Sequence, residues 1–448
     1  MTDSVDVLII GAGAAGLAAA GTLTEAGVNV AMIEARDRMG GRIWTHPDST
    51  AEFAIELGAE FVHGRPPEIF DFVRAGALKV REGMGEMWYS RGGKLIQGEK
   101  VFSEYEKLFK RMEEHVRGGK PDLSFADFLR DCCPEVSNDG KEWATRYVEG
   151  FNAADASRIS VRSLVEGEIA EQQIDGDRAF RIEGGYVRLV EALRARIDSN
   201  RCAIHLNHVV REVGWSRGQV VVEATSGNVE EVRRFQARRA IITLPLSILQ
   251  AGAAGPVRFS PSLEMKQSAL ACLEMGTAFH ITLRFREPFW ADPSFKGVSG
   301  GLSRMSFLFS KSEPFPTWWS PRPGAPVLTG WTAGGSARKL IGSTSEQVEE
   351  ISVTALAQTL GVETKLVRDL QQASYFHDWQ ADRFSQGAYS YVLVGGAESA
   401  QRQLAAQVED TLFFAGEATH YEGHYAMVHG AIATGRRAAA EVLAVRRV

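Results

Sequence analysis

The sequence predicts an α/β protein in which a domain built on a parallel sheet is interleaved with a second, α+β domain. The N-terminal stretch reads as strand, helix and strand: VDVLIIG, a helix from about Ala14 to Ala26 that Gly27 ends, then VNVAMIE. A strand–helix–strand unit of this kind builds a parallel sheet. The 448 residues exceed what one hydrophobic core usually supports. Strand-like segments return after a helical middle without a long linker, so we expect the domains to interleave.

Periodicity and capping predict the remaining elements. SEYEKLFKRMEEHV has apolar residues at helical spacing within a largely helical stretch, 103–193, and Ser124-Phe-Ala-Asp127 resembles a capping box. Strands are predicted at QVVVEA, ARRAIITLP, FHITLRF and LFFAGE, and a last helix ends near Leu443. We assign 1–80, 178–272 and 384–448 to the parallel-sheet domain, and 81–177 and 273–383 to the second domain.

Composition and charge limit the classes of molecule that the chain is expected to bind. The net charge of −6 and the isoelectric point of about 6.0 argue against a nucleic-acid partner. The four cysteines form no CxxC pair, so we expect reduced thiols and a cytoplasmic location. The apolar run near the start follows Asp3 and Asp6 rather than a basic segment, so we interpret it as a buried strand and helix and expect no membrane anchor. The sequence leaves the oligomeric state open.

A glycine-rich turn lies between the first strand and the first helix. In Gly11-Ala-Gly13-Ala14-Ala15-Gly16, the first glycine permits a tight turn, the second lets the backbone approach a pyrophosphate, and the third allows close helix–strand packing. The helix N-terminus offers unpaired N–H groups to anionic oxygens. Glu34 ends the second strand 18 residues later, where a carboxylate binds ribose hydroxyls. Together these features predict a dinucleotide site.

The residues after the second strand indicate which dinucleotide the site binds. Ala35 and Arg36 follow Glu34, and the pair Gly40-Gly41 is followed by Arg42. This run, with the glycine turn before it, resembles the N-terminal signature of the flavin-containing amine oxidase family. The resemblance implies FAD in a Rossmann-like domain of the glutathione-reductase type, with both arginines near the adenosine and the pyrophosphate.

The resemblance extends over nearly the whole chain. IELGAEFVHG, with Gly58, Ala59 and Glu60, matches the family segment near the flavin ring, and RIEGGYVRLVEAL matches a helix start. The strand at His208-Val-Val210 matches one whose backbone meets adenine. LFFAGEATHYEGHYAMVHGAIATG closes the site, so the resemblance implies cofactor contacts from Gly416, Glu417, Met427, Val428 and Trp379. Ala388 stands where monoamine oxidases carry the cysteine that bonds the flavin, so we expect noncovalent FAD.

The family chemistry implies where an amine would bind. Members transfer a hydride from the carbon beside a neutral amine nitrogen to flavin N5; the imine hydrolyses, and oxygen reoxidises the flavin to give hydrogen peroxide. Tyr389 in RFSQGAYSYV lies where the family has one of two aromatic walls, and Tyr425 or Ala426 would supply the second. His63 could orient a substrate amine or merely hydrogen-bond a loop carbonyl. Phe61 lies about where L-amino acid oxidases have the arginine that binds a carboxylate, and this disfavours amino acid substrates.

His280 is the main departure from the family pattern. In the strand Met275 to Phe285, apolar residues alternate with His280, Thr282 and Arg284, which predicts one apolar and one polar face. The stretch aligns on the family strand whose lysine holds a water against flavin N5, and His280 occupies the lysine position. The histidine would serve as proton acceptor or water anchor, or its lack of a fixed charge would slow the reaction with oxygen.

These residues form the predicted active site, and the predicted function has two alternatives. We expect His280, Tyr389 and Tyr425 to be catalytic, and Phe61, His63 and Trp379 to contact substrate. Histidines 420, 424 and 429 show no acidic or cysteine partner at a recognisable metal spacing, so no metal is expected. The substrate is a primary or secondary amine, polyamines included. The alternatives are a flavin dehydrogenase or desaturase with another acceptor, and a flavoprotein that has lost turnover and acts as a binding module.

Overall fold

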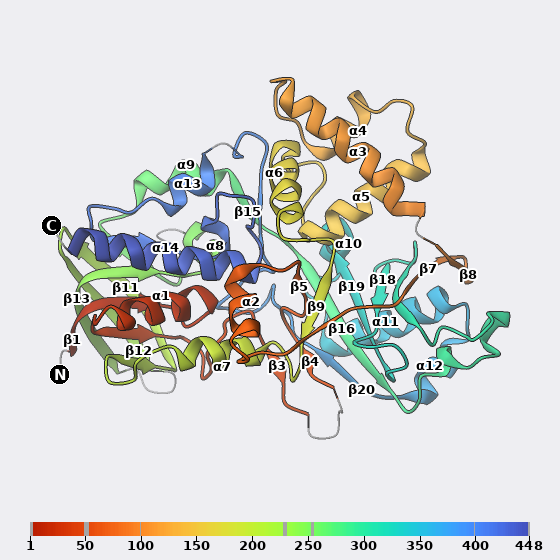
Figure 1. Cartoon of the computed structure of the whole chain (residues 1–448), viewed down its shortest axis with the longest axis horizontal. Helices are drawn as coiled ribbons and strands as arrows, with labels where there is room; N and C mark the ends of the chain where they lie inside the picture. Colours follow the sequence, from red (N-terminus) through yellow and green to blue (C-terminus); the bar gives the residue numbers. More distant parts are fainter. Residues whose placement is uncertain are drawn as a thin grey trace.

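Two large sheets organise the molecule, with a helical layer above the second one (Figure 1). The computed structural model describes residues 3–48, 53–98, 100–226, 231–251, 255–397 and 399–446. The first sheet is built from segments near the N-terminus, from the middle of the chain and from one strand near the C-terminus. The second takes its strands from residues 86–97 and 278–376. Chain segments of the two sheets therefore alternate along the sequence, while the exact domain boundaries stay a prediction.

The first sheet has a parallel centre, as predicted. Its order is β10 (Cys202–His205), β2 (Val30–Ile33), β1 (Asp3–Ile10), β13 (Val232–Ile242), β12 (Gln219–Ser226), β11 (His208–Ser216) and β14 (Arg258–Ser260), with β22 (Leu412–Phe414) also on β13. Strand β1 runs parallel to both of its neighbours, β2 and β13, and β22 runs parallel to β13. This arrangement brings the end of β1, the end of β2 and the end of β22 to one edge, where ligands bind in open α/β sheets.

Helices α1 (Ala14–Glu25), α7 (Val187–Ala195) and α14 (Val428–Arg446) lie together beside this sheet (Figure 1). Small residues let α1 and α14 approach closely: a Cβ on Gly435 would lie 2.1 Å from the carbonyl oxygen of Ala15. A Cβ on Gly16 would likewise lie 2.1 Å from the carbonyl oxygen of Gly11. Gly16 therefore does allow the close helix–strand packing that the sequence predicts.

The second sheet forms its own hydrophobic core. Its order is β20 (Gln371–Phe376), β16 (Ala278–Phe285), β19 (Val327–Ala333), β18 (Thr317–Trp319), β17 (Met305–Phe309), β7 (Glu86–Arg91) and β8 (Lys94–Gln97). Helices α10 (Gly334–Arg338), α11 (Ser345–Leu360) and α12 (Thr364–Leu370) all contribute buried residues to the same cluster. The stretch 103–193, predicted to be largely helical, contains α3 (Lys100–Arg117), α4 (Phe125–Asp131), α5 (Asn138–Asn152), α6 (Val161–Gln172) and most of α7, interrupted by strand β9 (Ala179–Ile182).

The remaining elements are short. They are β3 (Thr45–His46), β4 (Ile55–Glu56), β5 (Val62–His63), α2 (Pro67–Arg74), β6 (Val80–Glu82), β9 (Ala179–Ile182), α8 (Leu246–Gln250), α9 (Gln267–Ala271), β15 (Leu273–Met275), β21 (Ser390–Val392) and α13 (Ala400–Ala405). Strand β15 pairs with β21, and β9 lies between β5 and β6. Ser124 caps α4, since its hydroxyl accepts a hydrogen bond from the Asp127 N–H as predicted.

The strand that carries His280 differs from the expectation of one polar face. All of β16 is buried except Arg284: β19 and β20 pair with its two edges, and side chains and loops pack on both of its faces. The hydroxyl groups of Thr282 and Thr329 hydrogen-bond each other in the interior. His280 is only 9% exposed. The polar residues of this strand therefore lie inside the protein, where an unbonded polar group is costly.

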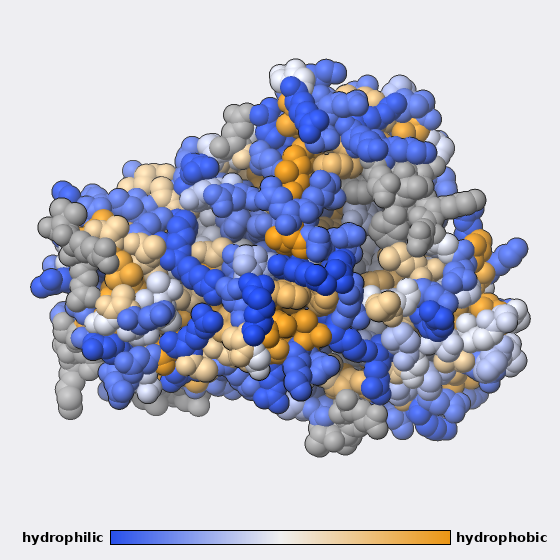
Figure 2. Space-filling model, viewed as in Figure 1, coloured by the Kyte–Doolittle hydropathy of each residue, from blue (hydrophilic) through white to orange (hydrophobic). Residues whose placement is uncertain are grey.

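Membrane-spanning helices are absent from the described part of the chain. No helix there is both long enough and apolar enough to cross a membrane. On the face shown in Figure 2, hydrophobic residues lie in small groups between hydrophilic ones.

Candidate active site

The glycine turn leaves an open cradle at the start of α1. Gly11 has φ +107°, a left-handed conformation that favours glycine. A Cβ on Gly13 would meet no protein atom within 4 Å, and Gly13 begins α1 without a side-chain cap. The first N–H groups of α1, from Ala14, Ala15 and Gly16, therefore face space that a phosphate-bearing ligand can occupy.

Glu34 closes the cradle on one side. Its carboxylate accepts hydrogen bonds from the backbone N–H groups of Ala12 at 2.7 Å and Arg36 at 2.9 Å. Burial raises the pKa of this carboxyl group, while the two backbone donors and the nearby arginines oppose the rise. The His208 N–H donates to the Glu34 carbonyl, which brings the start of β11, and with it buried Val210, beside the end of β2. Ala35 lies between Glu34 and Arg36, whose N–H group binds the Glu34 carboxylate.

Two arginines join the N-terminal loop to the C-terminal part of the chain. The Arg36 guanidinium donates to both carboxylate oxygens of Asp382, at 2.8 and 2.7 Å, and its centre lies 5.6 Å from the Trp379 ring. Arg42 donates to the Ala388 carbonyl and to Glu417 Oε1, at 2.8 and 2.9 Å. Both predicted arginines are therefore fixed in place by protein acceptors.

A second glycine region lies against Trp379. The indole N–H of Trp379 donates to the Leu57 carbonyl at 2.6 Å. A Cβ on Gly58 would lie 1.9 Å from the Arg42 carbonyl oxygen and 3.3 Å from the Trp379 ring, so only glycine fits. The Ala59 N–H donates to the Arg42 carbonyl. Residues 55–60 therefore pack on the loop that carries Gly41 and Arg42.

The C-terminal segment completes this region. Gly416 follows β22 with φ +128°, and a Cβ there would meet no protein atom within 4 Å. Glu417 is buried and accepts hydrogen bonds from Ser390 Oγ at 2.6 Å and from the Ala426 N–H at 3.1 Å, besides its ion pair with Arg42. Met427 follows Ala426, and α14 begins at the next residue, Val428. The open faces at Gly13 and Gly416, with the free first turn of α1, fit a dinucleotide cofactor such as FAD.

Aromatic side chains gather next to this region. We call Phe61, His63, Tyr147, Phe151, Trp319, Trp331 and Tyr389 the aromatic cluster. Ring centroids are 6.1 Å apart for Tyr147 and Phe151, and 5.3 Å apart for His63 and Phe151. Phe61 follows, 6.0 Å from His63 and 5.4 Å from Trp319. The cluster joins two predicted substrate residues, His63 and Phe61, to aromatic residues from other elements.

Hydrogen bonds fix the orientation of the cluster. The Tyr389 hydroxyl donates to the Phe151 carbonyl at 2.8 Å, and the Trp331 indole donates to the Gly150 carbonyl at 2.9 Å. Burial raises the pKa of the Tyr389 hydroxyl, so it stays protonated. Glu60 accepts from the Trp319 indole at 2.9 Å and pairs with Arg181 at 2.7 Å. Glu60 is predicted as a cofactor residue. In the structure its carboxylate binds the side chains of Trp319, which belongs to the aromatic cluster, and of Arg181.

His280 lies at the edge of the cluster, opposite Trp331 on β19, with the two rings 6.3 Å apart. Its Nε2 lies 2.8 Å from the Glu56 carbonyl oxygen. A carbonyl only accepts, so Nε2 carries the proton and a neutral ring keeps its lone pair on Nδ1. Burial lowers the pKa of His280 below its usual value, against smaller opposing effects of Glu60 and the Glu56 carbonyl. Burial also lowers the pKa of His63.

Tyr425 and Tyr389 pack in different hydrophobic clusters. The Tyr425 hydroxyl donates to the Ser163 carbonyl at 2.9 Å, and its ring packs with Val392 and Ala418. Tyr389 packs instead with Ala153, Ala278 and Ala333. The structure therefore brings His280, Trp331 and Tyr389 together and leaves Tyr425 facing α6. Its neighbour Ala426 adopts φ +62°.

Sequence reasoning missed several residues of the site. Among them are Phe151, Trp319 and Trp331 of the aromatic cluster, and Asp382, which binds Arg36. Arg38 was also missed; its guanidinium donates to three carbonyls of the loop, including that of Gly41 at 3.0 Å. Burial lowers the pKa of Arg38 to about 10. Only EARDRMGGR carried a signal for Arg38; the aromatic residues come from separate segments without a local motif.

Comparisons with known proteins agree with this geometry. A family model described as flavin containing amine oxidoreductase matches residues 14–443. Polyamine oxidase 3 of Oryza sativa subsp. japonica is 28% identical over 460 residues, which cover 97% of this chain and 88% of that protein. Lysine-specific histone demethylase 2 of Homo sapiens is 27% identical over 464 residues, covering 98% of this chain and 53% of that protein.

Solved structures show the same fold. Putrescine oxidase with bound putrescine superposes with a TM-score of 0.78 at 24% identity, covering 99% of this chain and 100% of that one. Cyclohexylamine oxidase from Brevibacterium oxydans IH-35A gives a TM-score of 0.79 at 19% identity, again covering 99% and 100%. The predicted fold, an FAD-type Rossmann-like domain interleaved with an α+β domain, is thereby confirmed. The chain belongs to the family of flavin-containing amine oxidoreductases.

Proposed function

We propose that this enzyme oxidises a primary or secondary amine, polyamines included, with noncovalent FAD, and that oxygen reoxidises the flavin to give hydrogen peroxide. Its membership of the family makes it a flavin-dependent amine oxidoreductase. The single observation that carries the more specific proposal is the half-buried aromatic cluster that meets His280 next to Gly58 and Trp379.

The chain's own residues would hold FAD along the open cradle. The N–H groups at the start of α1 and the open face of Gly13 would receive the pyrophosphate, and Gly416 would let the backbone approach the far end of the cofactor. When bound, flavin supplies the hydride acceptor for the carbon next to the amine nitrogen. Ala388 contributes its carbonyl to Arg42 and offers no thiol for a covalent bond, which supports noncovalent binding.

The aromatic cluster would prepare the amine. Aromatic faces attract the ammonium form and exclude water, and the same desolvation favours loss of its proton. Burial lowers the pKa of His280 and so favours its neutral form, in which Nδ1 is left as an acceptor. We assign His280 as the group that accepts this proton or holds the water for imine hydrolysis, with Tyr389 as the wall of the site.

Polyamines are the first substrates to test. Several of the curated relatives are polyamine oxidases, each near 28% identity over nearly the whole chain. The purified, FAD-loaded protein should be mixed without oxygen with putrescine, spermidine, spermine and monoamine controls. We expect loss of the flavin absorbance with an amine, followed by its return and release of hydrogen peroxide in air. If none of the amines bleaches the flavin, the proposal is overturned.

A dehydrogenase remains the second candidate because His280 stands where the family places a lysine. The same experiment separates the two. If reduced flavin persists in air and reoxidises faster in His280→Lys, the physiological acceptor is not oxygen. If wild-type flavin reoxidises promptly and the variant changes nothing, the oxidase assignment stands and His280 has no part in the oxygen reaction.

A further inference from the structure

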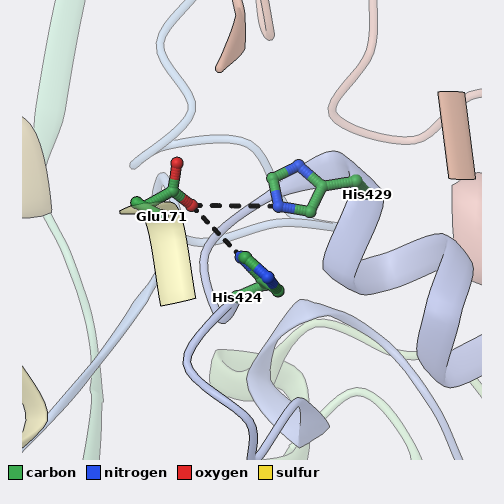
Figure 3. A group of neighbouring side chains, drawn as sticks. All are labelled: Glu171, His424 and His429. Atoms are coloured by element: carbon green, nitrogen blue, oxygen red, sulfur yellow. Dashed lines mark hydrogen bonds and ion pairs between the residues drawn. The ribbon is translucent and has the colours of Figure 1, made fainter. Parts of the chain in front are cut away.

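Two histidines and a carboxylate meet at the end of helix α6, beside the His63 end of the aromatic cluster. His424 Nδ1 lies 3.3 Å from Glu171 Oε1, and His429 Nε2 lies 3.9 Å from the same oxygen. Figure 3 shows both rings directed at this one carboxylate, Glu171 from α6, His424 from the preceding loop and His429 from the first turn of α14. Candidate ligand atoms of the three residues all lie within 4.8 Å of one another.

Buried atoms in this group lack partners. His429 is 3% exposed, and its Nε2 has no hydrogen-bond partner among the described residues. Glu171 Oε2 is also buried without a hydrogen-bond partner in the described part of the chain. Buried polar atoms are nearly always satisfied, so two unsatisfied atoms in one small group point to a missing ligand. The ligand must accept lone pairs from a carboxylate and from imidazole nitrogens.

We propose that Glu171, His424 and His429 bind a divalent zinc ion, with water in the fourth position. Zinc accepts two imidazoles and one carboxylate in tetrahedral geometry at about 2.0–2.1 Å, which separates ligand atoms by about 3.3 Å. The observed Glu171–His424 separation already equals this value, and the Glu171–His429 separation is 0.6 Å longer (3.9 minus 3.3 Å). The three ligand atoms, all within 4.8 Å of one another, would have to draw closer around the ion.

The ion would join two parts of the chain that are far apart in sequence. Glu171 belongs to the helical region, whereas His424 and His429 belong to the segment that follows β22 and opens α14. A bound ion would therefore fix α6 against α14. Because zinc binds only the folded arrangement, it should raise the melting temperature of the protein.

The experiment uses tag-free, FAD-loaded protein freed of metal with a chelator. Zinc chloride is titrated in competition with a zinc-sensitive dye, and retained zinc is measured after gel filtration. We expect about one zinc per chain and a higher melting temperature in the presence of zinc. Glu171→Gln and His424→Gln should each weaken binding by about a hundredfold or more and abolish the thermal shift. Glu422→Gln is the matched control: it removes the same charge from an exposed carboxylate near His424 and should bind zinc like wild type.

Each outcome decides the proposal. Failure of the wild type to retain zinc overturns it, as does equal retention by Glu171→Gln and wild type, which would mean an adventitious surface site. Flavin content of each variant shows whether it has folded. Because His424→Gln probes the site from a different element than Glu171→Gln, a folding defect in one variant leaves the other decisive. Amine oxidation is not part of the readout, so failure here leaves the proposed function untouched.

Discussion

His280 donates from Nε2 to the carbonyl oxygen of Glu56, 2.8 Å away, and this bond ties strand β16 to the segment that carries Gly58. It also fixes the tautomer, because a carbonyl cannot donate. The free lone pair of a neutral His280 is then on Nδ1, and burial favours this neutral form because it lowers the pKa of the ring. A lysine at this position would be a cation with three donors and no acceptor. The two residues therefore cannot perform identical chemistry here.

Replacing His280 with glutamine should slow flavin reduction by the amine. Glutamine can still donate from its amide to the Glu56 carbonyl, but it supplies no basic nitrogen. We expect a loss of about a hundredfold in the rate of flavin reduction, the usual contribution of a general base. In the wild type, any acid limb due to His280 should lie below pH 6.5, since burial lowers the pKa, and it should vanish in the variant. Stopped-flow reduction across pH checks both, and an unaltered rate would remove His280 from proton transfer.

Two substitutions of Tyr389 distinguish the role of its ring from the role of its hydroxyl group. Tyr389→Phe keeps the aromatic wall but leaves the Phe151 carbonyl without its donor at 2.8 Å, which should cost about 1 kcal/mol of unfolding free energy. The specificity constant kcat/KM for an amine should change little. Tyr389→Ala removes the wall and should lower kcat/KM by about tenfold or more. Steady-state kinetics on both variants measure this, and equal effects would show that the ring itself does not contact substrate.

Two glycines of the first turn should respond differently to alanine. A Cβ at Gly13 meets no protein atom within 4 Å, so Gly13→Ala should fold but place a methyl group where a cofactor phosphate would lie. FAD affinity should fall, with little change in the stability of the apoprotein. In Gly16→Ala the Cβ would lie 2.1 Å from the Gly11 carbonyl oxygen, so the fold itself should suffer. Fluorescence titration with FAD and thermal unfolding of each apoprotein distinguish them; equal FAD affinity in Gly13→Ala and wild type would place the phosphates elsewhere.

Local signals explain why the nucleotide-binding part could be predicted. The first strand, the glycine turn, α1 and Glu34 are adjacent in sequence, and each follows from short-range sterics or hydrogen bonding. The same holds for Ser124, whose hydroxyl caps the helix that begins at the next residue. These expectations matched the structure within one or two residues.

Long-range packing explains what could not be predicted. Alternation in β16 indicated a polar face, but residues distant in sequence pack over that face too, such as Glu56, whose carbonyl accepts a hydrogen bond from His280. No local pattern reveals such neighbours. Glu171 lies 253 residues before His424, so spacing within the histidine segment could not reveal the carboxylate beside it. Register within THYEGHYAMVHGA did not decide between Tyr425 and Ala426 either, because the direction of the Tyr425 ring depends on Ser163 in α6.

His420 should make the stability of the protein depend on acid. Burial, aided by His424 and Arg437, lowers its pKa to about 4, and its Nδ1 accepts hydrogen bonds from the N–H groups of Glu422 and His424. A histidine whose folded pKa lies below its unfolded value of about 6.5 adds no instability at higher pH, where both states are neutral. As pH falls from about 6.5 toward 4, only the unfolded state takes up the proton, and stability is lost.

The expected loss from this one group is about 2 kcal/mol between about pH 8 and pH 5. His420→Asn keeps a side-chain acceptor for the two N–H groups but cannot titrate, so the variant should lose about 2 kcal/mol less than wild type over the same interval. Urea denaturation at both pH values measures the difference between the two proteins, which cancels the contributions of the other buried histidines. Parallel losses in wild type and variant would mean that His420 takes up its proton without unfolding, through an opening of the segment before α14.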